Sequence, residues 1–318
     1  MTPTKKSYDV VVAGELNVDV ILNDISRFPA MGKEVIAGAM SITLGSSSAI
    51  FASNLSVLGT RVAFSGMLAR DQFGALITSS LQSRRVDTRY IVYTDRCSTG
   101  ATIALNFGED RAMVTYPGNM TLFSLQDIPD ELLQASGHLH VSSIFLSTGL
   151  KKDVNALFRK AKSLGLTTSL DPQWDPDERW DIDFRTLLPD VDVFLPNENE
   201  LLALTAKADI GEAVDALGQY ANIIVVKRGR EGASLWKSGE WIHQPAFVND
   251  QVQDAIGAGD SFCAGFIHEF IKGKKLSECL AFGALTGAIN TTRAGGTTAF
   301  DSMDTVRSIA RSSFNFNL

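Results

Sequence analysis

The chain alternates between short apolar runs rich in β-branched residues and longer stretches in which apolar residues recur with the period of a helix. The short runs predict strands buried on both faces of a sheet, and they lie at residues 9–13, 62–65, 139–142, 167–170, 191–195 and 223–227. The periodic stretches predict amphipathic helices, at residues 48–58, 72–83, 152–164, 198–204 and 211–217. Strands that alternate with helices are typical of an α/β fold, with a doubly wound, mostly parallel sheet flanked by helices.

Two regions interrupt this alternation, residues 15–45 and residues 88–117. Neither contains a convincing crossover helix, and both contain strand-like stretches, at residues 18–22, 34–43, 90–93, 101–107 and 112–116. Residues 107–111, which include Gly108 and Asp110, are typical of a hairpin turn. Short strands inserted into an α/β core predict a small β-sheet lid. Because no repeat or long linker is found, we expect a single domain over residues 1–318.

Composition narrows the class of protein. The 318 residues are 45% hydrophobic, which is enough for a large core, and the net charge of -7 argues against a nucleic-acid partner. The three cysteines, Cys97, Cys263 and Cys279, form no CxxC pair, so neither a disulfide framework nor a zinc site is expected. With no apolar leader at the N-terminus and no membrane-length apolar run, we expect a cytoplasmic protein without a membrane partner.

Residues 254–266, DAIGAGDSFCAGF, are the most informative segment. An extended run at residues 246–253 leads into a turn of small residues and then into an apolar helix that reaches about residue 271. Gly257, Ala258 and Gly259 let the backbone approach a ligand closely, and the free N–H groups of the following helix favour an anion. The segment therefore predicts an anion pocket, with Asp260 in the first turn of the helix.

A carboxylate beside a phosphate site needs a function, and the obvious one is to accept a proton from a hydroxyl that attacks the γ-phosphate of ATP. The alternative is an ordinary turn in which Asp260 caps the helix. Other glycine motifs do not fit. The chain has no GxxxxGK[ST] sequence, residues 257–259 lack the third glycine of GxGxxG, and Cys263 replaces the second glycine of GxSxG.

At this point the chain resembles the PfkB/ribokinase family of carbohydrate kinases over essentially its whole length. The family signature DTxGAGD is similar to DAIGAGD at residues 254–260, with Ala255 in the usual threonine position. Four further motifs follow the family order: GELNVD at 14–19 with FP at 28–29 and GKEV at 32–35, LG at 58–59 with DQFG at 71–74, PNENE at 196–200, and VVKRGREG at 225–232. The resemblance implies a ribokinase-like fold and an ATP- and Mg²⁺-dependent kinase.

The resemblance also implies roles at the ATP end of the site. Asp260 would be the catalytic base, and the amides of Gly257, Ala258 and Gly259 would stabilise the transferred phosphoryl group. Asn197 and Glu200 would act at the magnesium–phosphate end, Glu200 through water. Their spacing also fits a capping box, in which Asn197 caps a helix and Glu200 reaches back. Lys227, Gly229 and Gly232 would border the adenine and ribose, although residues 227–232 alone are typical of a hairpin.

Asn17 and Asp19 would hold substrate hydroxyls, because amides and carboxylates suit neighbouring hydroxyl groups. Asp19 alone could equally be a turn residue. Many family members bind a monovalent cation such as K⁺ beside the anion pocket. Asp254 and the carbonyls near Ile256 and Gly296 would supply its ligands.

Residues 44–50, LGSSSAI, depart from the family pattern GGxxxN. Gly45 remains, whereas Ser46 replaces a glycine, Ser47 a lysine of ribokinases, and Ile50 the asparagine. This wall predicts a different or smaller sugar pocket, and Ser142-Ser143 lacks an acidic residue of ribokinases, so ribose is disfavoured. Residues 170–174 and 227–229 favour fructose or 2-keto-3-deoxygluconate.

Two alternatives stay open, a nucleoside kinase of the same fold and a non-catalytic sugar sensor. A homodimer through the lid is expected by family analogy.

Overall fold

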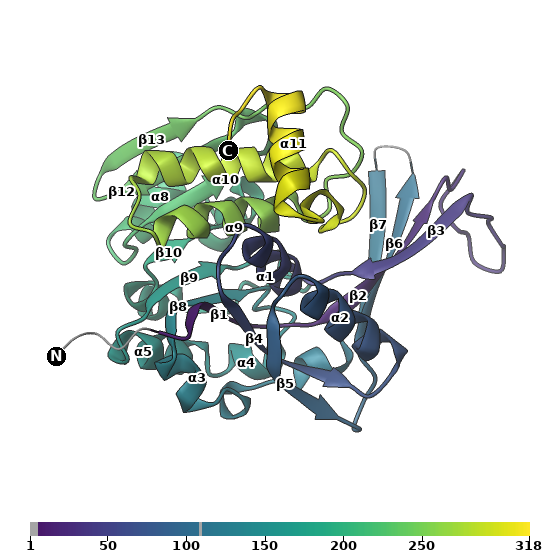
Figure 1. Ribbon diagram of the computed structural model, residues 1–318, viewed down its shortest axis with the longest axis horizontal. Helices are drawn as coiled ribbons and strands as arrows, with labels where there is room; N and C mark the ends of the chain where they lie inside the picture. Colours follow the sequence, from purple (N-terminus) through teal and green to yellow (C-terminus); the bar gives the residue numbers. More distant parts are fainter. Residues whose placement is uncertain (1–5, 108–109) are drawn as a thin grey trace.

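A large, mostly parallel sheet forms the centre of the molecule, and a smaller sheet projects from its side (Figure 1). The computed structural model describes residues 6–107 and 110–318. The strands of the large sheet follow in the order β13 (Glu240–Gln244), β12 (Ala233–Lys237), β11 (Ile224–Lys227), β10 (Val193–Phe194), β9 (Thr167–Asp171), β8 (Ser136–Ser142), β1 (Tyr8–Ala13), β4 (Val62–Ala69) and β5 (Asp87–Thr94). From β11 to β5, each strand runs parallel to its neighbours. The pairs β11–β12 and β12–β13 are antiparallel.

Helices cover both faces of this sheet, because successive side chains of a strand point to opposite faces. In β1, Val11 belongs to one apolar core, whereas Val10 and Val12 belong to the other. The first core includes side chains of α3 (Asp130–Gln134), α5 (Val154–Ser163), α6 (Phe184–Leu187), α7 (Glu198–Thr205) and α8 (Ile210–Gly218). The second includes side chains of α1 (Ser47–Val57), α2 (Gln72–Ser83), α9 (Ala258–Phe270) and α10 (Leu276–Asn290). This confirms the expected doubly wound α/β architecture.

The remaining elements are short or peripheral. Helix α11 (Met303–Phe314) packs with α10 in a third apolar cluster, and α4 (Thr148–Lys151) follows β8. Short 3-10 turns lie at Gly118–Thr121, Leu125–Asp127, Leu188–Asp190, Gly229–Glu231 and Thr298–Phe300. No helix in residues 6–107 or 110–318 has both the length and the apolar character needed to cross a bilayer.

The smaller sheet is the lid. Its order is β3 (Ala39–Leu44), β2 (Asn17–Asn23), β6 (Gly100–Phe107) and β7 (Asp110–Tyr116), and the parallel pair β2–β6 joins two antiparallel pairs. Cross-strand register places Asp19 beside Thr43 and Thr102, and Thr102 beside Thr115. The adjacent row is apolar, since Val20 lies beside Ile42 and Ile103. One face of the lid is therefore polar near the body, and the other is apolar.

The lid differs in two respects from the sequence prediction. Residues 90–93 were expected in the lid but lie in β5, the edge strand of the large sheet, so the lid's second segment begins near Gly100 rather than at residue 88. The strand expected at residues 34–43 is β3, which begins only at Ala39. The expected hairpin turn at residues 107–111 includes residues 108 and 109, which lie outside the described residues, although β6 and β7 pair antiparallel around it.

Candidate active site

A cavity of about 1610 Å³ lies between the lid and the carboxyl ends of the large sheet's strands. In an open α/β sheet, ligands bind at the carboxyl ends of strands, where the strand order reverses. Here the reversal is at β1, which has β8 on one side and β4 on the other. We call the part beside the lid and the ends of β1, β8 and β9 the acceptor end. The part beside the ends of β10 and β11 and residues 246–257 is the nucleotide end.

The glycine turn lies at the junction of the two ends. Gly257 has a φ of 75°, in the left-handed region, and a Cβ added there would lie 2.6 Å from the Cα of Gly296. The turn therefore requires glycine. Helix α9 begins at the next residue, and no side chain in the described part of the chain caps its N-terminus. Because residues 257–260 all line the cavity, the positive end of the helix dipole is available to an anion there.

Asp260 lies in the first turn of α9 and lines the cavity, with 7% of its surface exposed. Its Oδ1 accepts a hydrogen bond of 3.1 Å from Nε2 of Gln173. Burial first, and the charge of Asp171 second, raise the pKa of Asp260 from 3.8 to about 7, against the opposing charge of Lys227. A carboxylate with this pKa can accept a proton near neutral pH.

Asn197 and Glu200 form the capping box that their spacing suggested. Asn197 Oδ1 accepts from the amide of Glu200 at 2.8 Å, and Glu200 Oε2 accepts from the amide of Asn197 at 2.8 Å. Both residues also line the cavity, so capping and ligand contact are compatible. Burial raises the pKa of Glu200 to about 7. No cluster of three His, Cys, Asp or Glu side chains suited to a metal is found in the described residues. Contact of Glu200 with Mg²⁺ through water stays a prediction.

Lys227 lines the cavity with Gly229 and Gly232, and it also forms an ion pair that the sequence analysis did not foresee. Its Nζ lies 2.6 Å from Oδ2 of Asp171, which is only 1% exposed, and 3.7 Å from Sγ of Cys263. Burial works against the ammonium, yet Asp171, Cys263 and Glu200 together raise the pKa of Lys227 above its ordinary value. Gln173 donates 3.1 Å hydrogen bonds from the same Nε2 to Asp171 and to Asp260. The ion pair thus lies beneath the expected base, and our sequence prediction missed Asp171 and Gln173.

Gly229 and Gly232 line the nucleotide end, in the turn between the antiparallel strands β11 and β12. A Cβ added at Gly232, whose φ is 92°, would lie 2.0 Å from the carbonyl oxygen of Gln244. The hairpin expected at residues 227–232 is therefore confirmed, and it borders the cavity, whereas contact with adenine and ribose stays a prediction. Phe247, Val248 and Val252 give the same end an apolar wall.

The lid and helix α1 form the acceptor end. Asn17, which lines the cavity with Asp19, donates 3.1 Å hydrogen bonds to Asp19 Oδ1 and Thr102 Oγ1. Ser46 and Ser47 also line it, whereas Gly45 lies behind Asp19, where an added Cβ would be 2.3 Å from Asp19 Oδ1. The expected substrate residues therefore cluster, with Gly45 in a supporting position.

Glu15 was not predicted, although it is buried and lines the acceptor end. Its Oε1 accepts from the amide of Ser48 and from Oγ of Ser46, both at 3.1 Å, and its Oε2 accepts from Oγ of Ser48 at 2.5 Å. Burial raises the pKa of Glu15 to about 8, although these hydrogen bonds oppose the shift. Glu15 thereby fixes the serine wall. The hints in the sequence are its place in the GELNVD motif at residues 14–19 and its position just after β1, which ends at Ala13.

The expected cation ligands already take part in hydrogen bonds. Asp254 accepts from the amides of Ile256 and Gly295, one on each carboxylate oxygen, both at 2.9 Å. The carbonyl of Ile256 accepts from Nδ2 of Asn290 at 2.6 Å, and the carbonyl of Gly296 accepts from Nδ2 of Asn54 at 2.9 Å. Each of these oxygens accepts one hydrogen bond and keeps a second lone pair that an ion could use, so the cation site stays a prediction.

Comparison with known proteins gives a consistent result. Residues 7–303 match the family described as pfkB family carbohydrate kinase. The chain is 28% identical to an ATP-dependent ribose-1-phosphate kinase of Halopiger xanaduensis, over 91% of this chain and 94% of that protein. It is 29% identical to a 2-dehydro-3-deoxygluconokinase of Bacillus subtilis, over 75% of this chain and 77% of that protein.

A solved structure supports the fold. The ribokinase of Arabidopsis thaliana complexed with ribose and ATP superposes with a TM-score of 0.79 at 24% identity, covering 94% of this chain and 97% of that chain. The expected ribokinase-like fold is therefore confirmed.

Proposed function

This chain belongs to the pfkB family of carbohydrate kinases, and from that premise we propose that it transfers the γ-phosphoryl group of ATP to a hydroxyl of a sugar, with Asp260 as catalytic base. The observation that supports this most is the position of Asp260. Its buried carboxylate lies in the first turn of an uncapped helix and faces a cavity that continues to the polar face of the lid.

In this mechanism Asp19 and Asn17 hold the sugar from the lid side, and the acceptor hydroxyl points toward Asp260. Asp260 takes the hydroxyl proton as the oxygen attacks phosphorus. The amides of Gly257, Ala258 and Gly259 stabilise the negative charge that develops on the phosphoryl oxygens. Asn197 and Glu200 would hold Mg²⁺ through water, and the metal neutralises phosphate charge when bound. Closure of the lid would exclude water as a competing acceptor.

An acceptor panel tests the proposal. ADP release should be measured with fructose, 2-keto-3-deoxygluconate, ribose and nucleosides, each with MgATP. We expect turnover with at least one sugar, with fructose-like or 2-keto-3-deoxygluconate-like acceptors ahead of ribose because the serine wall replaces the ribokinase pattern. ATP hydrolysis that no acceptor stimulates would contradict a kinase function and would favour a sugar sensor.

A nucleoside kinase is a second candidate, and the lining of the acceptor end gives the reason. Phe145, Leu146, Trp174 and Met113 line the cavity there and would offer an apolar surface to a nucleobase. Higher kcat/KM for adenosine or inosine than for any free sugar would decide in favour of this candidate.

The pH dependence of kcat/KM follows from the protonation of the base. Because Asp260 must be ionised to accept a proton, kcat/KM should rise with pH through about 7 and then level off, since the pKa of Asp260 is raised to about 7. An ordinary aspartate would place this limb near 3.8. A pH profile at subsaturating acceptor checks this. A rate that is constant from pH 5 upward would contradict the raised pKa.

We propose that the apolar face of the lid pairs with a second copy of the chain. Two cross-strand rows, Ile42–Val20–Ile103–Val114 and Met40–Leu22–Leu105–Ala112, cover this face. Met40 and Val114 are 64% and 65% exposed, which is unusual for an apolar row of this size.

Light scattering after size exclusion should therefore give about twice the 34.4 kDa of one chain. We expect Val114→Lys to give a monomer, because it places a charge in the apolar row, and Ser312→Lys on the exposed side of α11 to remain a dimer. A monomeric wild type, or a Val114→Lys variant that stays dimeric, would overturn the lid as the interface.

We propose that a monovalent cation can bind beside the glycine turn, with Asp254 and the carbonyls of Ile256 and Gly296 as its ligands. Each of these oxygens accepts one hydrogen bond and keeps a lone pair for an ion. Replacement of K⁺ by tetramethylammonium at constant ionic strength should therefore lower kcat. A kcat that does not change with K⁺ concentration would contradict this site.

A further inference from the structure

The acceptor end contains charged groups whose charges are already balanced within the protein. Binding of a phosphate or carboxylate on the acceptor would require a cation or a helix N-terminus able to receive it. In the described residues, the cations that line the cavity are Lys151, Lys227 and Arg230. Lys227 is paired with Asp171, and Arg230 lies at the nucleotide end in the turn Gly229–Glu231. Lys151 is therefore the cation to consider at the acceptor end.

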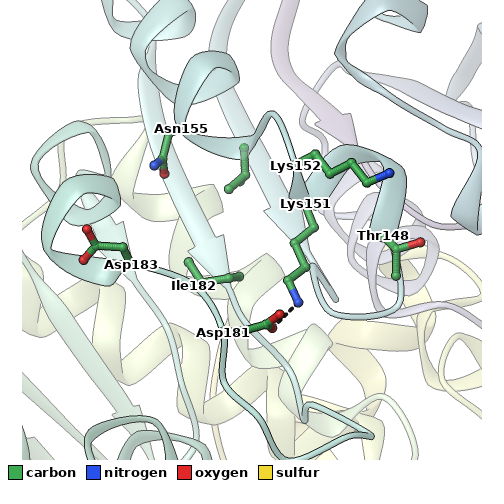
Figure 2. A pocket seen from close by; sticks show the side chains of 8 residues that line it. Thr148, Lys151, Lys152, Asn155, Asp181, Ile182 and Asp183 are labelled. Atoms are coloured by element: carbon green, nitrogen blue, oxygen red, sulfur yellow. Dashed lines mark hydrogen bonds and ion pairs between the residues drawn. The ribbon is translucent and has the colours of Figure 1, made fainter.

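Lys151 already forms an ion pair, with Asp181. It lies at the C-terminal end of α4 and, with Thr148, lines both the main cavity and a second cavity of about 450 Å³ (Figure 2). Figure 2 shows its ammonium directed at Asp181, with which it forms an ion pair, while Lys152 points away from that pair. The ring of Phe145 lies 5.2 Å from the same ammonium. Together these contacts satisfy Lys151 without any ligand.

Amides at the N-terminus of helix α1 also have hydrogen-bond acceptors within the protein. The amide of Ser48 donates to Oε1 of Glu15 at 3.1 Å, and the amide of Ala49 donates to Oγ of Ser46 at 3.0 Å. Two side chains thus take the amides of Ser48 and Ala49, the second and third residues of this helix. Helix α9 differs in this respect, because its N-terminus has no side-chain cap in the described part of the chain. Within the described residues, the N-terminus of α9 is therefore the more open of the two anion positions.

Carboxylates add repulsion at the acceptor end. Asp19 and Asp175 line it together with Asp260, as does Asp177, whose carboxylate pairs with Arg179 at 2.6 Å. Asp175 is 4% exposed and accepts from the amides of Asp177, Arg179 and Trp180, so its carboxylate is held in place. An anionic acceptor would be desolvated beside like charges with no uncommitted cation, and both effects oppose its binding.

We propose that the acceptor is an uncharged polyhydroxy compound, and that sugar phosphates and sugar acids are disfavoured because Lys151 is paired with Asp181 and the α1 N-terminus with Glu15. This inference rests on the proposed kinase function and narrows its substrate class. Of the two favoured acceptors, it selects the fructose-like one over 2-keto-3-deoxygluconate.

Pairs of acceptors that differ in charge but keep a free hydroxyl test this proposal. ADP release should be compared for fructose against fructose 6-phosphate, and for ribose against ribose 1-phosphate, with 2-keto-3-deoxygluconate as the acid. We expect kcat/KM to be at least about tenfold higher for the uncharged member of each pair, which corresponds to about 1.4 kcal/mol. Equal or higher kcat/KM for the anionic members would overturn the inference while leaving the kinase function intact. No turnover with any acceptor would instead overturn the kinase function.

A variant pair tests the role of Lys151 directly. Asp181→Asn releases the ammonium and is expected to raise kcat/KM for the anionic acceptors by about two- to fivefold, an effect typical of one partly exposed ion pair. The double variant Asp181→Asn/Lys151→Met keeps the first change but removes the cation, so it should lose this gain. A gain that persists in the double variant, or no gain in Asp181→Asn, would contradict the claim that Asp181 keeps the Lys151 ammonium from binding an anionic acceptor.

Discussion

Replacement of Asp260 by asparagine is expected to lower kcat by about 10²- to 10⁴-fold, the range typical for loss of a general base. Asparagine has nearly the same size as aspartate, and its side-chain oxygen can still accept the hydrogen bond from Gln173. Asparagine cannot, however, take the proton of the acceptor hydroxyl. The proposed nucleotide contacts at the glycine turn involve backbone amides, which this substitution leaves in place, so they should persist. Single-turnover transfer of labelled phosphate from ATP to the sugar measures the loss, and calorimetry measures the affinity for a non-hydrolysable ATP analogue.

A control on the same helix separates this effect from general damage to α9. Glu269 lies in its last turn and pairs with Lys272 at 2.9 Å, away from the cavity lining. Glu269→Gln should therefore retain near wild-type kcat. Turnover by Asp260→Asn at the wild-type rate would exclude Asp260 as base. Loss of ATP affinity equal to the loss of kcat would instead make it a nucleotide-binding residue.

Replacement of Lys227 by methionine is expected to destabilise the fold by about 3–5 kcal/mol, the usual result of breaking a buried ion pair from one side. The reason is that Asp171, which is 1% exposed, would keep its charge without a cation. Its second oxygen, Oδ1, already has no hydrogen-bond partner in the described residues. Urea denaturation gives the free energy of unfolding of each variant.

Two further variants show whether the loss of stability comes from the unpaired charge. The double variant Asp171→Asn/Lys227→Met removes both charges and should recover a large part of the stability. Arg61→Met breaks the ion pair with Asp9, whose side chains are 46% and 34% exposed, and should cost less than about 1 kcal/mol. If the double variant were as unstable as Lys227→Met, packing of the lysine stem rather than charge would explain the effect.

The site could be predicted from the sequence where its parts are local. The turn at Gly257 and the carboxylate of Asp260 lie within one short segment, so backbone geometry and helix dipole act over neighbouring residues. The pair of Asp171 and Lys227 could not be predicted in this way, because strand β10 lies between β9 and β11 and only the sheet order brings their ends together. The motif around Lys227 indicated where its backbone lies, but not the direction of its side chain.

The lid shows the same limit. Strand-like stretches without a crossover helix predicted β2, β3, β6 and β7, yet an edge strand of the large sheet looks the same in sequence, and residues 90–93 were assigned to the wrong sheet. Glu15 could not be recognised because its partners, Ser46 and Ser48, come 31 and 33 residues later in the chain. The local sequence preferences used for prediction contain no information about such long-range contacts.

A crystal structure of the complex with a non-hydrolysable ATP analogue and the acceptor found by the panel tests the central claim most directly. We expect the terminal phosphate on the amides of residues 257–259, and the acceptor hydroxyl within about 2.6–3.2 Å of the Asp260 carboxylate. A phosphate bound elsewhere in the cavity, or an acceptor hydroxyl out of reach of Asp260, would contradict the account.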